Sequence, residues 1–412
     1  MTGSVATIAV DVKAPAPRPS GRGAPLVLEL RSDLRWSPED ASALDALIEQ
    51  RPHVGVFVTT AWLSGFLAEP PAGFEPSILV LREGGVLKGM VPLATRRMPT
   101  HRRVTLLGGG IGSDRVDLLA ARGYEATFSD MFLDWLATSF GRKGFVVELR
   151  DVPDDSPLWG AIRRASVEQR LPLAIVPREI HAAPYLALRE RSVGASEGLM
   201  DGWGPVKSTT KHRRWLERRG ELRIELVETA DEAAVEFERL ADWLGARWGS
   251  GASALDHPRA IRFHRHVLPR LLDERRLRMI RLRAGLRPIA AFYGLASPGG
   301  SPASAARASR TWWGYYLAGY DREWAGRIHL GQITLAAAIE LALADRAAEF
   351  DFLKGAERVK YLWPVRERVT VDADVYSSNC GAQLTRARRA AREMVAALAR
   401  STCGLFSARS PR

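Results

Sequence analysis

The sequence predicts an α/β protein made of two similar halves, and three patterns carry this prediction. Two strand–turn–strand units, residues 77–95 and 278–296, lie in the two halves, each after a helical segment. Segments with apolar residues at helical spacing alternate with these strands. Between Thr311 and Leu353 a strand, a polar loop, an apolar helix and a second strand follow one another, which predicts a βαβ unit with parallel strands and a right-handed crossover.

The first half is expected to begin with a strand at Leu26 to Leu30 and a helix at Pro38 to Glu49. In the hairpin that follows, Gly84 and Gly85 supply the positive φ that a tight turn requires. Further elements are then expected: strands at 103–107 and 144–150, and helices at 125–140 and 158–169.

The second half is expected to start where serine, glycine and charged residues replace the periodic pattern, between Arg189 and Lys207. We therefore divide the chain into a flexible leader at 1–25, a first domain at 26–190, a second domain at 191–376 and a basic tail at 377–412. The elements expected before the second hairpin are a basic helix at 207–219, a strand at 222–227, and helices at 231–248 and 258–274.

Composition limits the compartment and the partners. The chain has 59 lysines and arginines against 47 acidic residues, a net charge of +12, which favours anionic partners such as CoA phosphates, nucleic acid or an anionic membrane without selecting one. No apolar run approaches the roughly 20 residues that cross a bilayer, and the first 25 residues lack the pattern of a secretory signal. The two cysteines, Cys380 and Cys403, fit a reducing cytoplasmic setting rather than a disulfide framework.

Several common kinds of site are argued against. The glycines from Gly108 to Gly112 follow a strand, but no helix comes directly after them, so a dinucleotide site is not expected. His264 and His266 are two apart on a predicted helix and point to different faces, which argues against a shared metal ion. No Gly-x-Ser-x-Gly elbow is present, which argues against a serine hydrolase.

The βαβ unit carries the main functional signal. Its aromatic strand, Thr311 to Tyr320, is followed by a polar loop, and Gly331 precedes an apolar helix. The first amides of a helix lack internal partners and lie at the positive end of its dipole, and a glycine lets an anion approach them. Arg327 and His329 add charge or donors in the loop. This predicts a phosphate site, although an ordinary crossover with a turn glycine has the same pattern.

The same region resembles a known family. The run Tyr316 to Ala325, then Gly331, then the stretches Phe350–Gly355 and Lys360–Trp363, are similar to the CelD-type acetyltransferases, which belong to the GNAT superfamily and are related to the FemAB aminoacyl-ligases. A more diffuse likeness extends back to Val54. The resemblance implies tandem GNAT-like domains with mixed, splayed central sheets, in which the strands at 311–320 and 349–353 separate and admit the pantetheine arm of an acyl-CoA.

The resemblance also implies roles for individual residues. Backbone N–H groups near Ala318 to Tyr320 would stabilise the oxyanion, and Tyr315 or Tyr316, whichever faces the cleft, would protonate the leaving thiolate. Lys360 would steady negative charge beside the reacting carbonyl. The candidate bases are Asp321, Glu323 and Glu357. The residues expected to bind the cofactor are Ala318, Gly319, Tyr320, Arg327, Gly331, Gln332 and Ile333. The plain structural alternatives are that Asp321 caps a turn, that the tyrosines are core residues and that Lys360 is solvated.

One departure leaves the donor open. The usual GNAT loop, Gln/Arg-x-x-Gly-x-Gly/Ala, is not matched, because Arg327 is followed four residues later by the single Gly331. The expected activity is transfer of an acyl group from acetyl-CoA or another acyl-CoA to an amine or hydroxyl of a saccharide or other small acceptor. The resemblance alone suggests exopolysaccharide or cell-envelope synthesis. The alternatives are an aminoacyl-tRNA-dependent ligase and a non-catalytic accessory protein of polysaccharide synthesis.

The two basic segments have open interpretations. The helix at 207–219 is either a solvated surface or a contact for CoA phosphates or an RNA backbone. The tail from Thr385 to Arg400 is expected to form an amphipathic basic helix, for which loose attachment to an anionic membrane is an alternative to a solvated surface.

Overall fold

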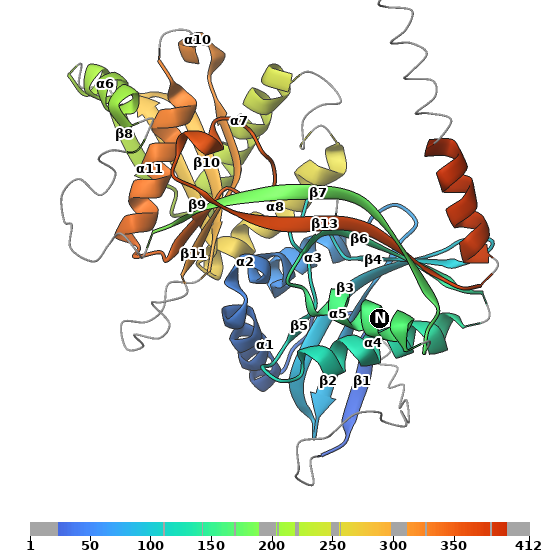
Figure 1. Ribbon diagram of the computed structural model, residues 1–412. Helices are drawn as coiled ribbons and strands as arrows, with labels where there is room; N and C mark the ends of the chain where they lie inside the picture. The colour runs from blue at the N-terminus through green and yellow to red at the C-terminus, as the bar shows by residue number, and fades with distance from the viewer. Residues whose placement is uncertain are drawn as a thin grey trace, which may run out of the picture.

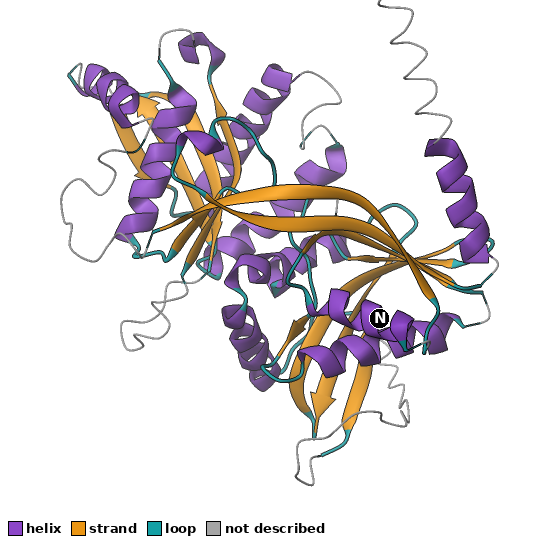
Figure 2. Ribbon diagram, viewed as in Figure 1, coloured by secondary structure: helices purple, strands orange, loops and turns teal. Residues whose placement is uncertain are grey.

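The computed structural model places its thirteen described strands in one mixed sheet (Figures 1 and 2). The described residues are 24–109, 112–141, 143–168, 170–188, 203, 206–218, 222–248, 255, 257–297, 311–325, 328–379 and 381–393. Along the sheet the strand order is β1-β2-β3-β4-β6-β13-β7-β12-β11-β10-β9-β8, and β5 pairs with β3 beside this path. The predicted α/β class with a mixed central sheet is confirmed.

The bounds of the elements are as follows. The strands are β1 (Leu26–Arg31), β2 (Glu75–Glu83), β3 (Val86–Arg97), β4 (Arg102–Leu106), β5 (Leu119–Ala120), β6 (Phe145–Pro153), β7 (Leu173–Ala187), β8 (Leu222–Leu226), β9 (Leu277–Ala284), β10 (Arg287–Ala296), β11 (Trp312–Tyr320), β12 (Glu349–Asp351) and β13 (Arg366–Ser377). The helices are α1 (Pro38–Gln50), α2 (Pro52–Gly55), α3 (Thr60–Ala68), α4 (Glu125–Phe140), α5 (Pro157–Val167), α6 (Val206–Glu217), α7 (Ala230–Trp248), α8 (Pro258–Asp273), α10 (Arg322–Ala325) and α11 (Leu330–Ala344), with short 3-10 turns η1 (Val56–Val58) and η2 (Lys360–Leu362).

Elements with strong local signals form where the sequence predicts them. Both hairpins are present, and Gly84, Gly85 and Gly285 adopt φ values of 55°, 86° and 61° at their turns. Helix α1 begins after Ser37, whose hydroxyl accepts from the Asp40 amide and so satisfies one of the unpaired donors of the first turn. Strands β11 and β12 pair in parallel, as expected of the βαβ unit.

Two long strands, β7 and β13, were not expected from the sequence, and together they join the two halves. They pair antiparallel over almost their whole length, from Leu173 with Ser377 to Tyr185 with Arg366. Figure 1 shows them side by side, β7 in green and β13 in orange-red, crossing between the two groups of helices. The strand β13 also pairs with β6, so residues assigned to the second domain lie in the sheet between two strands of the first. The boundary near residue 190 stays a prediction.

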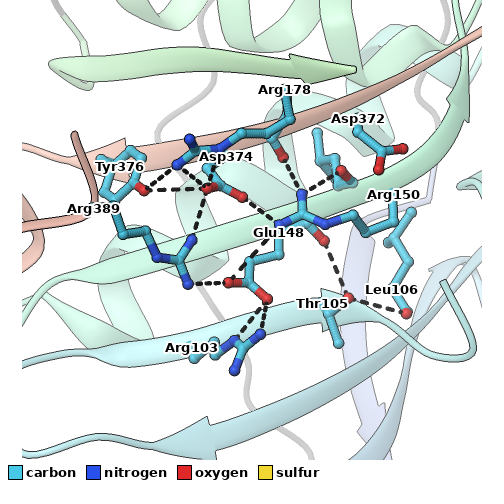
Figure 3. Close-up of polar contacts among 12 residues, drawn as sticks. Arg103, Thr105, Leu106, Glu148, Arg150, Arg178, Asp372, Asp374, Tyr376 and Arg389 are labelled. Atoms are coloured by element: carbon cyan, nitrogen blue, oxygen red, sulfur yellow. Dashed lines mark hydrogen bonds and ion pairs between the residues drawn. The ribbon is translucent and has the colours of Figure 1, made fainter. Parts of the chain in front are cut away.

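A charged network holds β13 in this position (Figure 3). The carboxylate of Asp374 is fully buried and accepts hydrogen bonds from Arg150 at 2.6 Å, Arg178 at 2.8 Å and Arg389 at 2.7 Å. Burial opposes its ionisation, but the Arg150 guanidinium and its neighbours hold the pKa of Asp374 below the usual value. Arg389 also donates to Glu148 on β6 at 2.6 Å. The carboxyl-terminal helix is therefore attached to the sheet through these arginines.

The carboxyl-terminal helix starts earlier than the sequence suggested. Residues 381–393 are helical, whereas the prediction began at Thr385, and the part of that prediction from 394 to 400 lies outside the described residues. Cys380 and Cys403 also lie outside them. Within the described part of the chain, no helix is both long enough and apolar enough to span a bilayer.

The second half of the sheet is covered on both faces by different parts of the molecule. On one face Phe292 and Trp313 pack against the apolar helix α11, including Ile333 and Ile339. On the opposite face Trp312 and Tyr293 belong to a core that includes α7, α8 and residues of the first half. The contact between α3 and α8 is close, because a Cβ on Gly65 would lie 2.5 Å from the Phe263 ring. A ligand can therefore reach β11 from the α11 face or from the face of α7, α8 and the first half.

Candidate functional site

The site is the point where β11 and β12 separate. The two strands pair at Trp312 with Glu349, Trp313 with Phe350, and Gly314 with Asp351, and their pairing ends there. Strand β11 continues to Tyr320, whereas the chain after β12 follows β7, with the Phe352 amide donating to the Pro184 carbonyl at 2.9 Å. Beyond Gly314 the edge of β11 that faced β12 therefore has no strand partner in the described chain. Such an edge presents backbone donors and acceptors to an extended ligand.

A β-bulge occurs on β11 at the same place. Tyr293 of β10 lies opposite Leu317 and Gly294 lies opposite Tyr315, so Tyr316 is the extra residue of the bulge. The two neighbouring tyrosines face opposite sides of the sheet, as successive strand residues do, and the bulge places Leu317 on the same side as Tyr316. Tyr315 stacks on Phe292 on the α11 side, with ring centroids 5.6 Å apart. Tyr316 faces the side of α7, α8 and the first half.

The two tyrosines therefore have different surroundings. The Tyr316 hydroxyl donates to the Gly112 carbonyl at 2.7 Å, its ring lies 5.4 Å from Trp62, and burial raises its pKa well above the ordinary value. On the other face, burial and the nearby Glu357 raise the pKa of Tyr315 to about 12. Tyr315 shares the α11 face with Gly331, and Tyr316 does not. The role of proton donor to a thiolate bound on that face suits Tyr315 better than Tyr316, and it stays a prediction.

The start of α11 differs in detail from the predicted phosphate cradle. The amides of Gln332 and Ile333 both donate to the His329 carbonyl, at 3.0 and 3.1 Å, so these two are not free to bind a ligand as expected. The Gly331 amide has no hydrogen-bond acceptor among the described residues. Gly331 does not adopt a positive φ, and a Cβ there would make an ordinary contact of 3.5 Å with the Tyr320 ring. Its absence of a side chain therefore provides space beside Tyr320 rather than a turn.

The basic helix α6 lies along α11 and brings further groups to this end. Arg213 Nη1 donates to both Glu340 carboxylate oxygens, at 2.8 and 2.7 Å, which fixes α6 against α11. The His212 ring lies 4.8 Å from the His329 ring. Burial, His329 and Lys211 lower the pKa of His212, so this imidazole is neutral at pH 7. Arg327 lies outside the described residues.

Lys360 is buried, which rules out the alternative that it is solvated. It is 4% exposed, and its Nζ lies 2.8 Å from the Lys354 carbonyl, 3.3 Å from the Gly355 carbonyl and 2.8 Å from Glu357 Oε2. An ammonium has three N–H donors, and three oxygens surround this one. Glu357 is 62% exposed and lies over Gly355, whose φ is 115°. In this conformation Lys360 closes the loop from 354 to 360.

Replacing Lys360 by methionine is expected to lower the free energy of unfolding by about 2–3 kcal/mol, because two partly buried carbonyls lose their charged donor. Denaturant titration measures this change. The matched control is Arg358→Met on the same loop, where the side chain is exposed and no comparable loss is expected. Equal stability of the two variants would show that the Lys360 contacts do not hold the loop.

Asp321 and Glu323 lie at the far end of β11, and their roles as bases stay predictions. Both carboxylates pair with Arg287 at 2.6 Å, and Asp321 also accepts from the Glu323 amide at 3.0 Å, as a cap of α10. Asp321 comes seven residues after Gly314, about 23 Å along an extended strand. The expected oxyanion donors at Ala318, Gly319 and Tyr320 pair with β10 on one edge and lie along the open edge on the other.

A loop of the first half reaches the gap, and sequence reasoning did not find it. Arg115 donates to both Asp351 oxygens at 2.6 Å, and the two side chains are 1% and 0% exposed. Asp114 accepts a hydrogen bond from the Lys354 amide at 3.4 Å. Burial and Asp151 raise the pKa of Asp114 to about 6. The only sequence signal for this loop was an Asp-Arg pair one residue after the glycine cluster at 108–112.

Strained backbone also gathers at this junction. Five described residues other than glycine have positive φ, and three of them meet here: Arg115 at 54°, Asp151 at 53° and Leu353 at 57°. Arg115 and Asp151 are joined by a hydrogen bond of 2.9 Å from the Arg115 amide to the Asp151 carboxylate. Such conformations are costly and persist where the surrounding structure fixes them, often at functional sites.

A separate cavity of about 350 Å³ lies in the first half, between the start of α1 and the turn of the β2–β3 hairpin. Its arginine, Arg82, is already paired with Asp40 and Glu29 at 2.6 and 2.7 Å. We therefore place the functional site at the gap beside β11 and not at this cavity. Within the described part of the chain, no three histidine, cysteine or acidic side chains are arranged to hold a metal ion.

Comparison with known proteins agrees with this geometry. Residues 206–361 match the family model described as an acetyltransferase (GNAT) domain, which covers the β11–α11–β12 unit. The chain matches no curated protein in sequence. Among solved structures it is similar to FemX, at 9% identity over 84% of this chain and 97% of that one, with a TM-score of 0.56. This likeness shows a shared fold and nothing about substrates.

Two further solved structures are similar over comparable lengths. One is a tandem GNAT protein from the clavulanic acid biosynthesis pathway, at 16% identity over 85% of this chain and 98% of that one, with a TM-score of 0.42. The other is the carboxyl-terminal domain of a putative lysylphosphatidylglycerol synthetase from Agrobacterium fabrum, at 10% identity over 83% and 95%, with a TM-score of 0.44. The expected GNAT-like α/β fold is confirmed, whereas a specific CelD-type membership is not.

Proposed function

We propose, from the match of residues 206–361 to the GNAT acetyltransferase family, that this chain transfers an acyl group from acyl-CoA to a small acceptor at the gap between β11 and β12. The observation that carries the proposal is that these strands pair at three positions and then diverge at a bulge. The open edge of β11 can pair with the amides of a pantetheine arm, as an added strand does.

The anionic end of the donor is proposed to lie at the start of α11. The Gly331 amide, which has no acceptor among the described residues, the space beside Tyr320 and the positive end of the helix dipole all favour a phosphate there. Lys211 and His212 on α6 adjoin the same end. The amides of Gln332 and Ile333 are bonded to the His329 carbonyl. The proposal therefore keeps these two residues, and Arg327, only as neighbours of this site.

Acyl transfer from a thioester requires stabilisation of the oxyanion and of the leaving sulfur. Amides on the open edge of β11, from Ala318 to Tyr320, are proposed to serve the oxyanion. Tyr315 stays protonated at neutral pH because its pKa is raised to about 12, so it can donate a hydrogen bond to the leaving sulfur. Lys360 and Glu357 are proposed to act by holding the loop that borders Tyr315.

The finer assignments rest on the sequence resemblance. We propose an acceptor with an amine or hydroxyl, such as a saccharide, in exopolysaccharide or cell-envelope synthesis in the cytoplasm, as the CelD-type pattern implies. Residues 381–393 carry the exposed Arg386, Arg388 and Arg392, which leaves loose association with an anionic membrane a prediction. A non-catalytic accessory role is the further alternative. It would be supported if substitutions at the proposed site caused no loss of activity.

A second candidate function has a specific observation in its favour. The loop before α11 departs from the usual GNAT pattern, and the basic helix α6 lies beside it. These features suit the end of an aminoacyl-tRNA as donor, in a protein whose fold is similar to that of FemX. In that case binding would weaken steeply with salt, because each phosphate contact releases counterions.

The test is thermal unfolding with acetyl-CoA and, in parallel, with aminoacyl-tRNA. Acetyl-CoA at about 100 times its Kd is expected to stabilise the native state by about 2.7 kcal/mol, seen as a rise of several degrees in Tm. Gly331→Glu is expected to abolish the rise, because it puts a negative charge where phosphate binds. Its matched control Gly331→Gln has the same size without the charge and should keep more of the effect.

The outcomes separate the two candidates. No rise with acetyl-CoA, together with a salt-sensitive rise with aminoacyl-tRNA, would replace the first function by the second. No rise with either would contradict both. The unliganded Tm of each Gly331 variant reports whether the substitution itself disturbs the fold, and the ordinary contact that a Cβ makes with Tyr320 predicts that it does not.

A further inference from the structure

We propose that Asp114 accepts the proton of the acceptor and that this acceptor is a primary amine. The inference rests on the proposed acyl transfer and deepens it. The loop that carries Asp114 comes from the first half and contacts both diverging strands. The Tyr316 hydroxyl of β11 donates to the Gly112 carbonyl at 2.7 Å, and the Lys354 amide, three residues after β12, donates to the Asp114 carboxylate at 3.4 Å.

This loop lies on the side of the gap opposite the proposed donor site. Tyr315, Phe292 and α11 form one face, and Tyr316 with the first half forms the other. An acyl-CoA held by the start of α11 presents its thioester to the gap from the first face. A nucleophile that attacks from the second face meets Gly112, Asp114 and Tyr316.

The charges around Asp114 indicate what kind of guest fits. Both terminal nitrogens of the Arg115 guanidinium donate to Asp351, and Asp151 accepts from the Arg115 amide and from Thr370. Asp114 is the partly exposed residue of this group, and among the described residues its hydrogen-bond donor is the Lys354 amide alone. A primary ammonium supplies the missing positive charge and several N–H donors. A hydroxyl acceptor supplies no charge and leaves the carboxylate uncompensated.

The protonation of Asp114 suits a base. Burial and the charge of Asp151 raise its pKa to about 6, against the opposing effects of Arg115 and Lys354. The remaining titratable neighbour, Tyr316, stays protonated because its own pKa is raised. Asp114 is therefore ionised at neutral pH, yet it binds a proton more readily than an ordinary aspartate. A base with a pKa near the working pH is the effective one.

The chemical step balances as follows. The ammonium gives one proton to the Asp114 carboxylate, and the freed lone pair forms the C–N bond with the thioester carbonyl carbon. When the C–S bond breaks, a second N–H proton passes to the leaving sulfur, which becomes the CoA thiol. Asp114 then returns its proton to water. The products are an amide, CoA and one released proton.

The experiment compares the full-length protein with its Asp114→Asn variant. Release of CoA thiol from acetyl-CoA is followed with a set of primary amines that includes glucosamine, each matched by its hydroxyl counterpart, glucose for glucosamine. We expect amines and not hydroxyl counterparts to be acetylated. We expect Asp114→Asn to lower kcat/KM at least 100-fold, the scale of a lost general base. The fall of the wild-type rate below about pH 6 is expected to vanish in the variant.

Three controls keep the result interpretable. Asp114→Asn is expected to leave the Tm rise with acetyl-CoA unchanged, because the donor binds on the other face. Asp114→Glu keeps a carboxylate and is expected to retain part of the rate and the acid limb of the profile. Asp154→Asn changes an exposed aspartate at the end of β6 and is expected to have no effect.

The inference and the proposed function fail in different ways. If acetyl-CoA stabilises the wild-type chain but Asp114→Asn acetylates amines with an unchanged rate and pH profile, the role of Asp114 is overturned. If the donor-stabilised wild-type chain acetylates hydroxyl counterparts, or none of the amines, the amine assignment is overturned. If acetyl-CoA does not stabilise the wild-type chain, the proposed function itself is overturned and the inference with it.

Discussion

Arg115→Met is expected to lower the free energy of unfolding by about 3–5 kcal/mol, the cost of breaking a buried ion pair from one side. Arg115 donates to both oxygens of Asp351, and neither side chain is exposed to water. The substitution leaves the carboxylate with the Trp312 indole and with Arg368, which is already shared with Glu349. Denaturant unfolding monitored by fluorescence and by circular dichroism measures the loss.

Two further variants decide whether the loss comes from the pair. Arg122→Met removes an exposed arginine of the same half and should change stability by less than about 0.5 kcal/mol. The double variant Arg115→Met with Asp351→Leu removes both charges and should be markedly more stable than Arg115→Met alone. The ion pair does not join the halves as we describe if Arg115→Met is as stable as the wild type. The same conclusion follows if the double variant loses as much free energy of unfolding as the two single substitutions lose together.

The same pair predicts a dependence on pH. Burial opposes ionisation of Asp351, but Arg115 and Arg368 hold its pKa below the usual value. A carboxyl whose pKa is lower in the folded state contributes stability that is present above its unfolded pKa, about 3.9, and is lost as pH falls through the folded value. The difference in the free energy of unfolding between wild type and Arg115→Met should therefore be largest at pH 6–7 and decrease below about pH 4.

Elements defined by local pattern were predictable from the sequence. The helix at Glu125–Phe140 was expected with the same bounds because its apolar residues recur at helical spacing. Both hairpins followed from strand patterns on either side of glycines such as Gly85 and Gly285. The parallel pairing of β11 and β12 followed from the strand–helix–strand order alone.

The ribbon of β7 and β13 was not predictable, because its strands depend on partners far away in the chain. Strand β7 contains Pro177 and Pro184, which weaken a strand pattern, and β13 carries charges such as Asp372 and Asp374. Those charges are tolerated only because arginines from β6, β7 and the last described helix surround Asp374. No local window of sequence contains that information.

The candidate site was predictable on one face of the gap and not on the other. Gly331, Tyr315 and Lys360 come from one contiguous region whose order of elements and resemblance point to a donor site. Asp114 and Arg115 come from a loop more than 200 residues earlier, which only the tertiary fold brings to Lys354 and Asp351. The opposite orientations of Tyr315 and Tyr316 follow from the alternation of side chains along a strand, whereas strand propensity does not reveal the bulge that places Leu317 beside Tyr316.

Asp374→Ala is expected to cost about 3–5 kcal/mol, because it leaves several arginines in a partly buried site without their shared carboxylate. Arg150, Arg178 and Arg389 come from β6, β7 and the carboxyl-terminal helix, and all three donate to Asp374 (Figure 3). Denaturant unfolding measures the loss of stability, and Asp154→Ala at an exposed position is the matched control. Arg389→Gln removes one donor only and is expected to cost less than half as much.

The local consequence separates this network from a general loss of stability. When Asp374 is removed, the helix at 381–393 loses its attachment through Arg389, so trypsin should cleave at Arg386 and Arg388 before the rest of the chain unfolds. Because β13 lies against β7, and β7 in turn positions the chain after β12, we also expect weaker stabilisation by acetyl-CoA in Asp374→Ala. Unchanged cleavage together with unchanged stability would mean that pairing with β6 and β7 holds β13 without these charges.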